Sequence, residues 1–156
     1  MAHFAELNEN NIVNDIQCDS RYFHNYIPHV QILCEKTSVV SDLIEEPVLP
    51  TYCYTREYIT GKELKVHKDR QACEISLTVN LDCDIPWDIW IATPSGEERC
   101  VTLRPGDAMI YLGCAATHWR EEFEGNFCSQ VFLHYVRSRG PYSNVYFDKK
   151  QTLYGD

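Results

Sequence analysis

Seven short segments rich in β-branched and aromatic residues follow one another after Pro50, and Gly, Pro or Asp residues separate most of them. They are 51–59 (TYCYTREYI), 63–67 (ELKVH), 73–81 (CEISLTVNL), 86–92 (PWDIWIA), 98–103 (ERCVTL), 107–113 (DAMIYLG) and 128–136 (CSQVFLHYV). We see no helical periodicity between them, which favours a sandwich, barrel or jelly roll. We expect roughly eight strands in this core, a number typical of jelly rolls. Residues 93–98 (TPSGEE) and 104–108 (RPGDA) have the composition of tight turns.

The N-terminal part has a different character. Residues 1–29 are polar and irregular, with a short strand expected near Ile12–Ile16. Apolar residues then recur at helical spacing, which predicts one amphipathic helix that ends before Pro47 and Pro50. They are Val30, Leu33, Cys34, Val40 and Ile44. We therefore expect a single domain, in which the segment 1–46 packs its helix on a β-domain formed by residues 47–156.

Charge and cysteine usage limit the function classes. The 156 residues carry a net charge of -9 with a pI of about 5.1, which argues against a nucleic-acid partner. The chain has no apolar run long enough to cross a membrane and no recognisable signal peptide, so we expect a cytoplasmic protein without a membrane partner. The eight cysteines form no CxxC pair, and we expect them to be reduced.

The stretch 63–70 (ELKVHKDR) places His67 and Asp69 on the same side of an extended chain. A mononuclear iron site needs two histidines and one carboxylate on one face of the metal. His118 is the favoured third ligand because it follows the strand expected to end near Leu112, whereas His134 reads as a core or supporting histidine. The competing interpretation is a surface salt-bridge patch, because basic residues crowd the segment. They are Lys65, Lys68 and Arg70.

Two longer stretches resemble the double-stranded β-helix of 2-oxoglutarate/Fe(II)-dependent oxygenases, in particular the prolyl 4-hydroxylase-like enzymes and the DNA-repair demethylases. Residues 55–81 (TREYITGKELKVHKDRQACEISLTVNL) contain a tyrosine, a glycine three positions later and then the HxD motif. Residues 101–125 (VTLRPGDAMIYLGCAATHWREEFEG) resemble the segment that delivers the distal histidine. The resemblance spans roughly residues 47–137.

The resemblance implies that His67, Asp69 and His118 bind Fe(II), with 2-oxoglutarate and O2 as cosubstrates. It implies that Tyr58 hydrogen-bonds the 2-oxoglutarate, and it favours hydroxylation or demethylation over halogenation because halogenating relatives have a small residue in place of Asp69. Tyr54 is expected to pack in the core, and core packing is also the alternative interpretation of Tyr52 and Tyr58, as an ion pair with Glu74 is of Arg56. The implied activity is hydroxylation of a C–H bond of a peptidyl substrate, with prolyl as the specific case, or of a small-molecule substrate, with release of succinate and CO2.

One expected residue is missing. Relatives place an Arg or Lys about ten residues after the distal histidine to bind the C5 carboxylate of 2-oxoglutarate, but residues 124–132 (EGNFCSQVF) contain no base. Gln130 is the nearest long polar side chain there, and it cannot neutralise a carboxylate. A buried anion needs a cation, and guanidinium is the usual one. We rank Arg56 first, because it shares a strand face with Tyr58, then Arg120 and then Arg137.

Two other function classes remain open at this stage. The missing base keeps a cupin-like metal- or ligand-binding module without turnover as the alternative, and a structural β-sandwich with a fortuitous HxD is the third possibility. The first 13 residues (MAHFAELNENNIV) faintly resemble the N-termini of bacteriophage structural proteins, which would place the protein in a host cytoplasm. Trp87, Trp90 and Trp119 could line a groove, but packing is the preferred interpretation.

Overall fold

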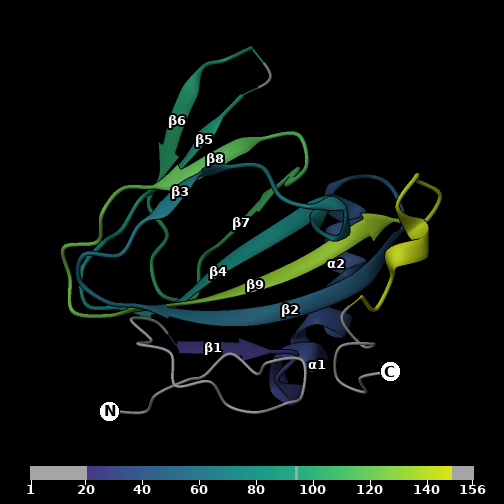
Figure 1. Ribbon diagram of the computed structural model, residues 1–156. Helices are drawn as coiled ribbons and strands as arrows, with labels where there is room; N and C mark the ends of the chain where they lie inside the picture. Colours follow the sequence, from purple (N-terminus) through teal and green to yellow (C-terminus); the bar gives the residue numbers. More distant parts are fainter. Residues whose placement is uncertain (1–20, 94, 149–156) are drawn as a thin grey trace, which may run out of the picture.

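The computed structural model describes residues 21–93 and 95–148 (Figure 1). Nine strands and two α-helices form this part of the chain, together with two short 3-10 turns at Gln71–Cys73 and Ser143–Val145. The strands are β1 (Arg21–His24), β2 (Val48–Tyr58), β3 (Leu64–His67), β4 (Ile75–Cys83), β5 (Ile89–Ala92), β6 (Glu98–Val101), β7 (Ala108–Tyr111), β8 (Thr117–Arg120) and β9 (Cys128–Arg137). The helices are α1 (Ile27–Glu35) and α2 (Thr37–Leu43).

Two antiparallel sheets make up the β-core, and Figure 1 shows the smaller sheet above the larger one. The larger sheet has the strand order β1-β2-β9-β4-β7, and the smaller sheet has the order β3-β8-β5-β6. From β2 to β9, strands that follow one another in the sequence change sheet at every step except β5–β6. Eight strands follow residue 46, and this jelly-roll arrangement confirms the fold class that the sequence predicts.

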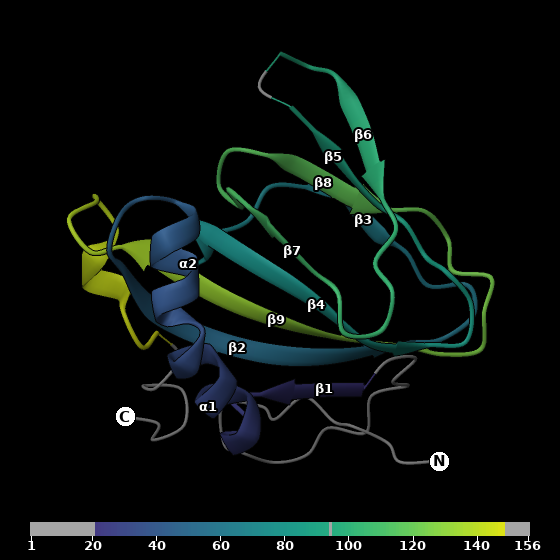
Figure 2. The same cartoon turned by 180° about the vertical axis from the view of Figure 1, so that it is seen from behind.

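The helices cover the outer face of the larger sheet, as Figure 2 shows from behind. Leu33 and Val40 are buried in one hydrophobic cluster with residues of β2, β4 and β9. The Tyr135 hydroxyl fixes α1 to the sheet by donating a 2.8 Å hydrogen bond to the Leu33 carbonyl. The expected packing of an N-terminal helical segment on the sheet is therefore present.

That helical segment is divided at Lys36 rather than continuous. The hydroxyl of Thr37 donates to the Leu33 carbonyl, and the hydroxyl of Ser41 donates to the Thr37 carbonyl. Such bonds compete with the backbone ladder of a helix. The expectation that residues up to 29 are irregular is wrong in part, because Arg21–His24 pairs with β2 and α1 begins at Ile27.

The larger sheet has a polar inner face. Strand β9 alternates, so Val131, Leu133 and Tyr135 pack under the helices while Gln130 and His134 point between the sheets. Strand β4 adds buried polar side chains to the same inner face. They are Ser76, Thr78 and Asn80. Buried polar groups are costly unless they are hydrogen-bonded, so this face predicts a ligand site between the sheets.

The two expected tight turns are present, and each uses a glycine at positive φ. Gly96 has a φ of 83° and Gly106 a φ of 90°. The Gly106 amide donates to the Asn80 carbonyl, which fixes the turn against the end of β4. The expectation that all cysteines are reduced is wrong for Cys83 and Cys128, which form a disulfide because β4 and β9 bring them opposite each other.

Five cysteines in the described part of the chain are free, namely Cys34, Cys53, Cys73, Cys100 and Cys114. The strand expected near Ile12–Ile16 and the 13 residues that resemble phage proteins lie outside the described residues. Within the described ranges, no helix has the length and apolarity needed to span a bilayer. The division into segments 1–46 and 47–156 stays a prediction.

Candidate metal centre

The pairing of β3 with β8 brings two of the predicted ligands together. His67 and His118 are direct register partners across these strands, and their ring centroids are 4.3 Å apart. Asp69 follows β3 by two residues, and its backbone amide donates to the Gly113 carbonyl at 2.9 Å. Asp69 Oδ1 lies 3.5 Å from His67 Nε2 and 3.6 Å from His118 Nε2. The three donor atoms lie within 4.8 Å of one another, which is the geometry of a shared cation site.

Both imidazoles are oriented in the same way. His67 Nδ1 lies 2.7 Å from the Lys65 carbonyl oxygen, and His118 Nδ1 lies 3.0 Å from the Ala116 carbonyl oxygen. A carbonyl oxygen only accepts, so each Nδ1 carries the proton and each Nε2 keeps its lone pair. Backbone partners of this kind commonly fix the tautomer of metal-binding histidines. The two imidazoles and the carboxylate therefore fit a divalent metal such as Fe(II).

The electrostatics of the three groups are coupled. The hydrogen bond with Asp69 raises the pKa of His67, against the effect of partial burial. Burial acts to raise the pKa of Asp69, but the His67 hydrogen bond and the nearby histidines outweigh it, so the pKa is lowered. Burial lowers the pKa of His118, whose side chain is 2% exposed. The cluster therefore contains an ionised carboxylate and a neutral buried imidazole near neutral pH.

Sequence reasoning missed two residues that position Asp69. A Cβ atom on Gly113 would collide with Asp69 Oδ2 and with the Cys73 carbonyl oxygen, so only glycine fits there. Ser76 donates a 2.8 Å hydrogen bond to Asp69 Oδ2, which leaves Oδ1 directed at the histidines. The only sequence signals were the glycine that ends the segment 107–113 and the serine in the strand after HxD.

His134 lies beside this cluster rather than in it. Its Nδ1 is 3.0 Å from Ser76 Oγ, and its ring packs against Tyr52 in a tilted arrangement with the ring centroids 4.6 Å apart. Burial lowers its pKa to about 4, so the ring is neutral at ordinary pH. His134 could join Asp69 and Cys73 around a second ion, but burial raises the pKa of the Cys73 thiol to about 12. These contacts agree with the supporting role that the sequence suggests.

Arg120 is the most buried cation near the metal cluster. It lies two residues beyond His118 on β8, so both side chains point between the sheets, and it is 1% exposed. The guanidinium donates to the Trp87 carbonyl and, at 3.5 Å, to Gln130 Oε1, while Nε has no partner. It forms no ion pair with any residue that the structure describes. Burial lowers its pKa, as expected for a cation without an anion.

Of the remaining predicted residues, Tyr58 lies close enough to Arg120 to interact with its charge, whereas Arg137 lies elsewhere. Tyr58 is fully buried, and its hydroxyl has no partner within the described structure. Arg56 Cζ lies 4.2 Å from the centroid of the Tyr58 ring, and Arg56 is the register partner of Gln130. The Nε of Arg56 is also buried and unpartnered there. Arg137, the third-ranked base, instead forms ion pairs with carboxylates at the far end of β9. They are Glu46 and Glu74.

No protein-family model matches the chain, and no curated protein matches it. Its fold is similar to that of AviO1 from Streptomyces viridochromogenes Tue57, at 16% identity and a TM-score of 0.62, over 81% of this chain and 72% of that one. It is also similar to a Pseudomonas putida prolyl-4-hydroxylase, at 14% identity and a TM-score of 0.61, over 76% of this chain and 71% of that one.

A third similar structure is an oxidoreductase of the 2OG-Fe(II) oxygenase family from Burkholderia pseudomallei. The identity is 16% and the TM-score 0.56, and the likeness covers 73% of this chain but 60% of that one. At such low identities the comparisons establish the fold. The chain shares its fold with these three structures, and it holds a His–Asp–His cluster between its two sheets.

Proposed function

We propose that the protein is an Fe(II)- and 2-oxoglutarate-dependent oxygenase that hydroxylates a C–H bond of a peptidyl or small-molecule substrate. The observation that carries the proposal is the inner face of β8. It presents a potential metal ligand, His118, and an unpaired buried guanidinium, Arg120, two residues apart. A ligand that binds metal at one end and carries an anionic group at the other fits both requirements, and 2-oxoglutarate is such a ligand.

In this proposal His67, Asp69 and His118 hold the metal, with Ser76 and Gly113 positioning Asp69. Bound iron and 2-oxoglutarate supply the oxidising chemistry that converts a C–H bond to an alcohol, with O2 consumed and succinate and CO2 released. The protein's residues orient these groups and exclude water. The carboxylate ligand agrees with hydroxylation rather than halogenation.

Arg120 would hold the C5 carboxylate of 2-oxoglutarate, with Tyr58 as the second donor. Four buried atoms without partners in the described structure support this assignment, since each is a hydrogen-bond group that burial leaves unsatisfied. They are Arg120 Nε, Arg56 Nε, the Tyr58 hydroxyl and Thr78 Oγ1. Arg120 is favoured over Arg56 because Arg56 stacks on two tyrosine rings and is less buried.

The cupin-like binding module is the competing function. Its sequence argument was the missing base after His118, and Arg120 supplies a base from a different position on the same strand as His118. Only turnover separates the two functions, because both bind metal. The P. putida neighbour is a prolyl-4-hydroxylase, and a proline-containing peptide is therefore the first substrate to test here.

The test is an anaerobic titration of the metal-free protein with Fe(II) and then with 2-oxoglutarate. We expect a weak visible charge-transfer band that grows with 2-oxoglutarate in the wild type and is absent in Asp69→Ala. On admission of O2, succinate should form. Iron binding with no band and no succinate would favour the cupin-like module, and an unchanged band in Asp69→Ala would overturn the metal assignment.

A further inference from the structure

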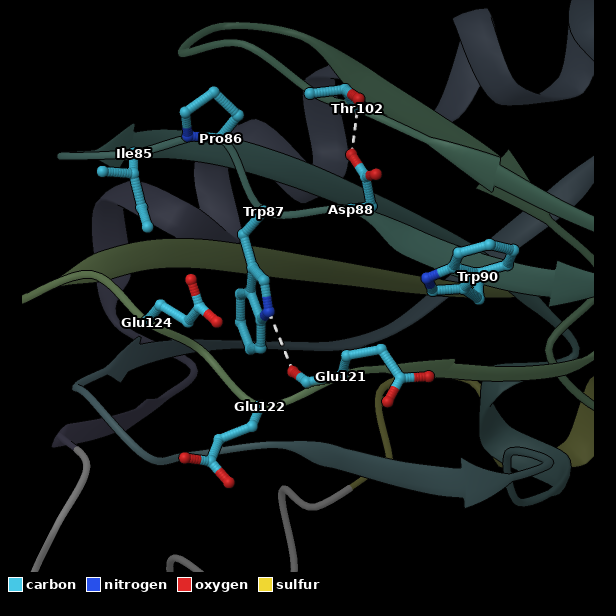
Figure 3. A pocket seen from close by; sticks show the side chains of 9 residues that line it. All are labelled: Ile85, Pro86, Trp87, Asp88, Trp90, Thr102, Glu121, Glu122 and Glu124. Atoms are coloured by element: carbon cyan, nitrogen blue, oxygen red, sulfur yellow. Dashed lines mark hydrogen bonds between the residues drawn. The ribbon is translucent and has the colours of Figure 1, made fainter.

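The outer side of the smaller sheet carries a hollow of about 480 Å³ that has no part in the proposed metal chemistry. Figure 3 shows the indole of Trp87 projecting from the segment before β5 toward the segment of Glu121–Glu124, where its Nε1 donates to the Glu121 carbonyl. The hollow is lined by two indoles, Trp87 and Trp90, and by four carboxylates that are named below. Neither His118 nor any other residue of the metal cluster lines it.

The alternation of β8 separates this hollow from His118 and Arg120, which point between the sheets. His118 and Arg120 point inward, so Trp119 points outward, where it stacks on Trp90 with an interplanar angle of 12°. Trp119 Nε1 donates a 3.0 Å hydrogen bond to Glu121 Oε1. Trp87 forms the boundary between the two sides. The Arg120 guanidinium lies 4.8 Å from the centroid of the Trp87 ring on the inner side, and Trp87 also lines the hollow.

Four carboxylates surround the two lining indoles, and no base lines the hollow. They belong to Asp88, Glu121, Glu122 and Glu124, and none of them forms an ion pair with a residue of the described structure. Asp88 accepts from the Thr102 hydroxyl, and Glu121 accepts from Trp119. Lys and Arg side chains bind such a surface well, because the aliphatic stem packs on indole while the cationic head meets carboxylates.

The arrangement of these carboxylates disfavours a single metal ion. A cation site brings three or more donor atoms close together, and these four residues form no such group in the described part of the chain. Figure 3 shows the side chains of Glu121, Glu122 and Glu124 diverging from one another along their segment. Charges spread in this way match a partner that also carries several separate charges.

We propose that this hollow docks a lysine- or arginine-bearing segment of a polypeptide partner, with one cationic side chain on the half-buried indole of Trp90 and its neighbours paired to the surrounding carboxylates. The inference does not depend on the metal chemistry, because every residue involved lies outside the metal cluster. The net charge of -9 favours approach of a basic partner from a distance.

The three tryptophans of the chain all belong to this surface, so intrinsic fluorescence reports on it selectively. The full-length, metal-free protein is titrated with acetyl-hexalysine-amide at low salt, with acetyl-hexaglutamate-amide as the matched peptide. We expect a saturable change in tryptophan emission with hexalysine alone. The double variant Glu121→Gln/Glu124→Gln should bind about tenfold more weakly, from two exposed charge pairs.

The matched control is Glu98→Gln, an exposed carboxylate at the opposite end of the β5–β6 hairpin. It should bind hexalysine as the wild type does. Equal weakening in the control and in the double variant would mean non-specific attraction and would overturn the proposal. A saturable emission change with Ca²⁺ or Mg²⁺ and none with hexalysine would also overturn it, in favour of a metal site.

Discussion

The inner face of β8 and the segment that follows the strand carry opposite charges. On the inner face, Arg120 is a cation that is 1% exposed and has no anionic partner among the described residues. On the outer side, Glu121, Glu122 and Glu124 are exposed anions without a cationic partner in the same part of the chain. One run of residues, 117–124, thus carries a buried cation on the strand and exposed carboxylates after the strand ends.

This contrast shows how burial sets the strength of a charged site. A charge pair inside the protein acts at low effective dielectric and is screened little by salt, whereas an exposed pair is worth at most about 1 kcal/mol and weakens with salt. The inner site therefore favours one ligand of fixed geometry. The outer hollow favours a partner that gains from several weak contacts together.

Removing the inner cation should have the largest effect. Arg120→Leu should weaken 2-oxoglutarate binding by about 100-fold or more, because the carboxylate would be buried without its partner. Fe(II) affinity should stay within about threefold, since Arg120 is not a ligand. The growth of the charge-transfer band against 2-oxoglutarate concentration measures the first quantity, and the anaerobic Fe(II) titration measures the second.

The matched variant is Arg56→Leu, which removes the other unpartnered arginine of the inner cavity. It should weaken 2-oxoglutarate by clearly less than Arg120→Leu does. The reverse ranking would move the anion site to Arg56. The thermal midpoint of Arg120→Leu should not fall far, because a buried unpaired cation contributes little to stability.

Filling the space at Gly113 should damage the inner site through its backbone. Gly113→Ala puts a methyl group against Asp69 and the Cys73 carbonyl, which should weaken Fe(II) binding by about 10- to 100-fold. Overpacking should also cost about 1–3 kcal/mol of unfolding free energy, measured by urea denaturation. Gly106→Ala is the control: nothing lies near its Cβ position, and its cost should come from positive φ alone, with Fe(II) affinity unchanged.

The buried imidazole of the inner face should make stability depend on pH. The pKa of His134 is lowered to about 4 in the folded protein. Between about pH 6.5 and 4 this histidine is therefore protonated in the unfolded chain but neutral in the folded protein. The contribution of neutral His134 to the free energy of unfolding is complete above pH 6.5 and should fall by about 2 kcal/mol between pH 7 and 5. Urea denaturation at both pH values should show this loss, and His134→Gln should reduce it by a similar amount.

The smallest effect should be that of a variant at one site on ligand affinity at the other site. Glu121→Gln/Glu124→Gln should leave 2-oxoglutarate affinity within about threefold of the wild type, and Arg120→Leu should leave hexalysine binding similarly unchanged. Raising the salt should weaken hexalysine binding and leave 2-oxoglutarate binding nearly constant. A strong effect of either variant on the opposite face would mean that Trp87, which touches both, couples them.

Local pattern was enough to predict much of the fold. Alternating apolar residues and turn residues marked the strands after Pro50, and the HxD spacing placed His67 and Asp69 on one side of the chain. His118 followed from its position after the glycine-ended strand, and the structure brings it to Asp69. Each of these features depends on residues close together in the sequence, where side-chain direction follows from the period of the element.

Features that depend on distant pairing could not be predicted in the same way. The contact between Gly113 and Asp69 exists only because two loops meet, and the disulfide of Cys83 with Cys128 follows from the register of β4 with β9. Arg56 was ranked above Arg120 because the sequence shows that Arg56 shares a strand face with Tyr58. The sequence does not show how deeply either arginine is buried.

The pairing of β3 has a mechanical consequence. This strand is an edge of its sheet and touches β8 through two register pairs separated by an irregularity, Leu64 with Arg120 and His67 with His118. An ion held by His67, Asp69 and His118 would cross-link this edge strand to β8. Part of the free energy of metal binding would then stabilise residues 64–67 against local unfolding. Slower amide hydrogen exchange along β3 would then report metal occupancy without any turnover at all.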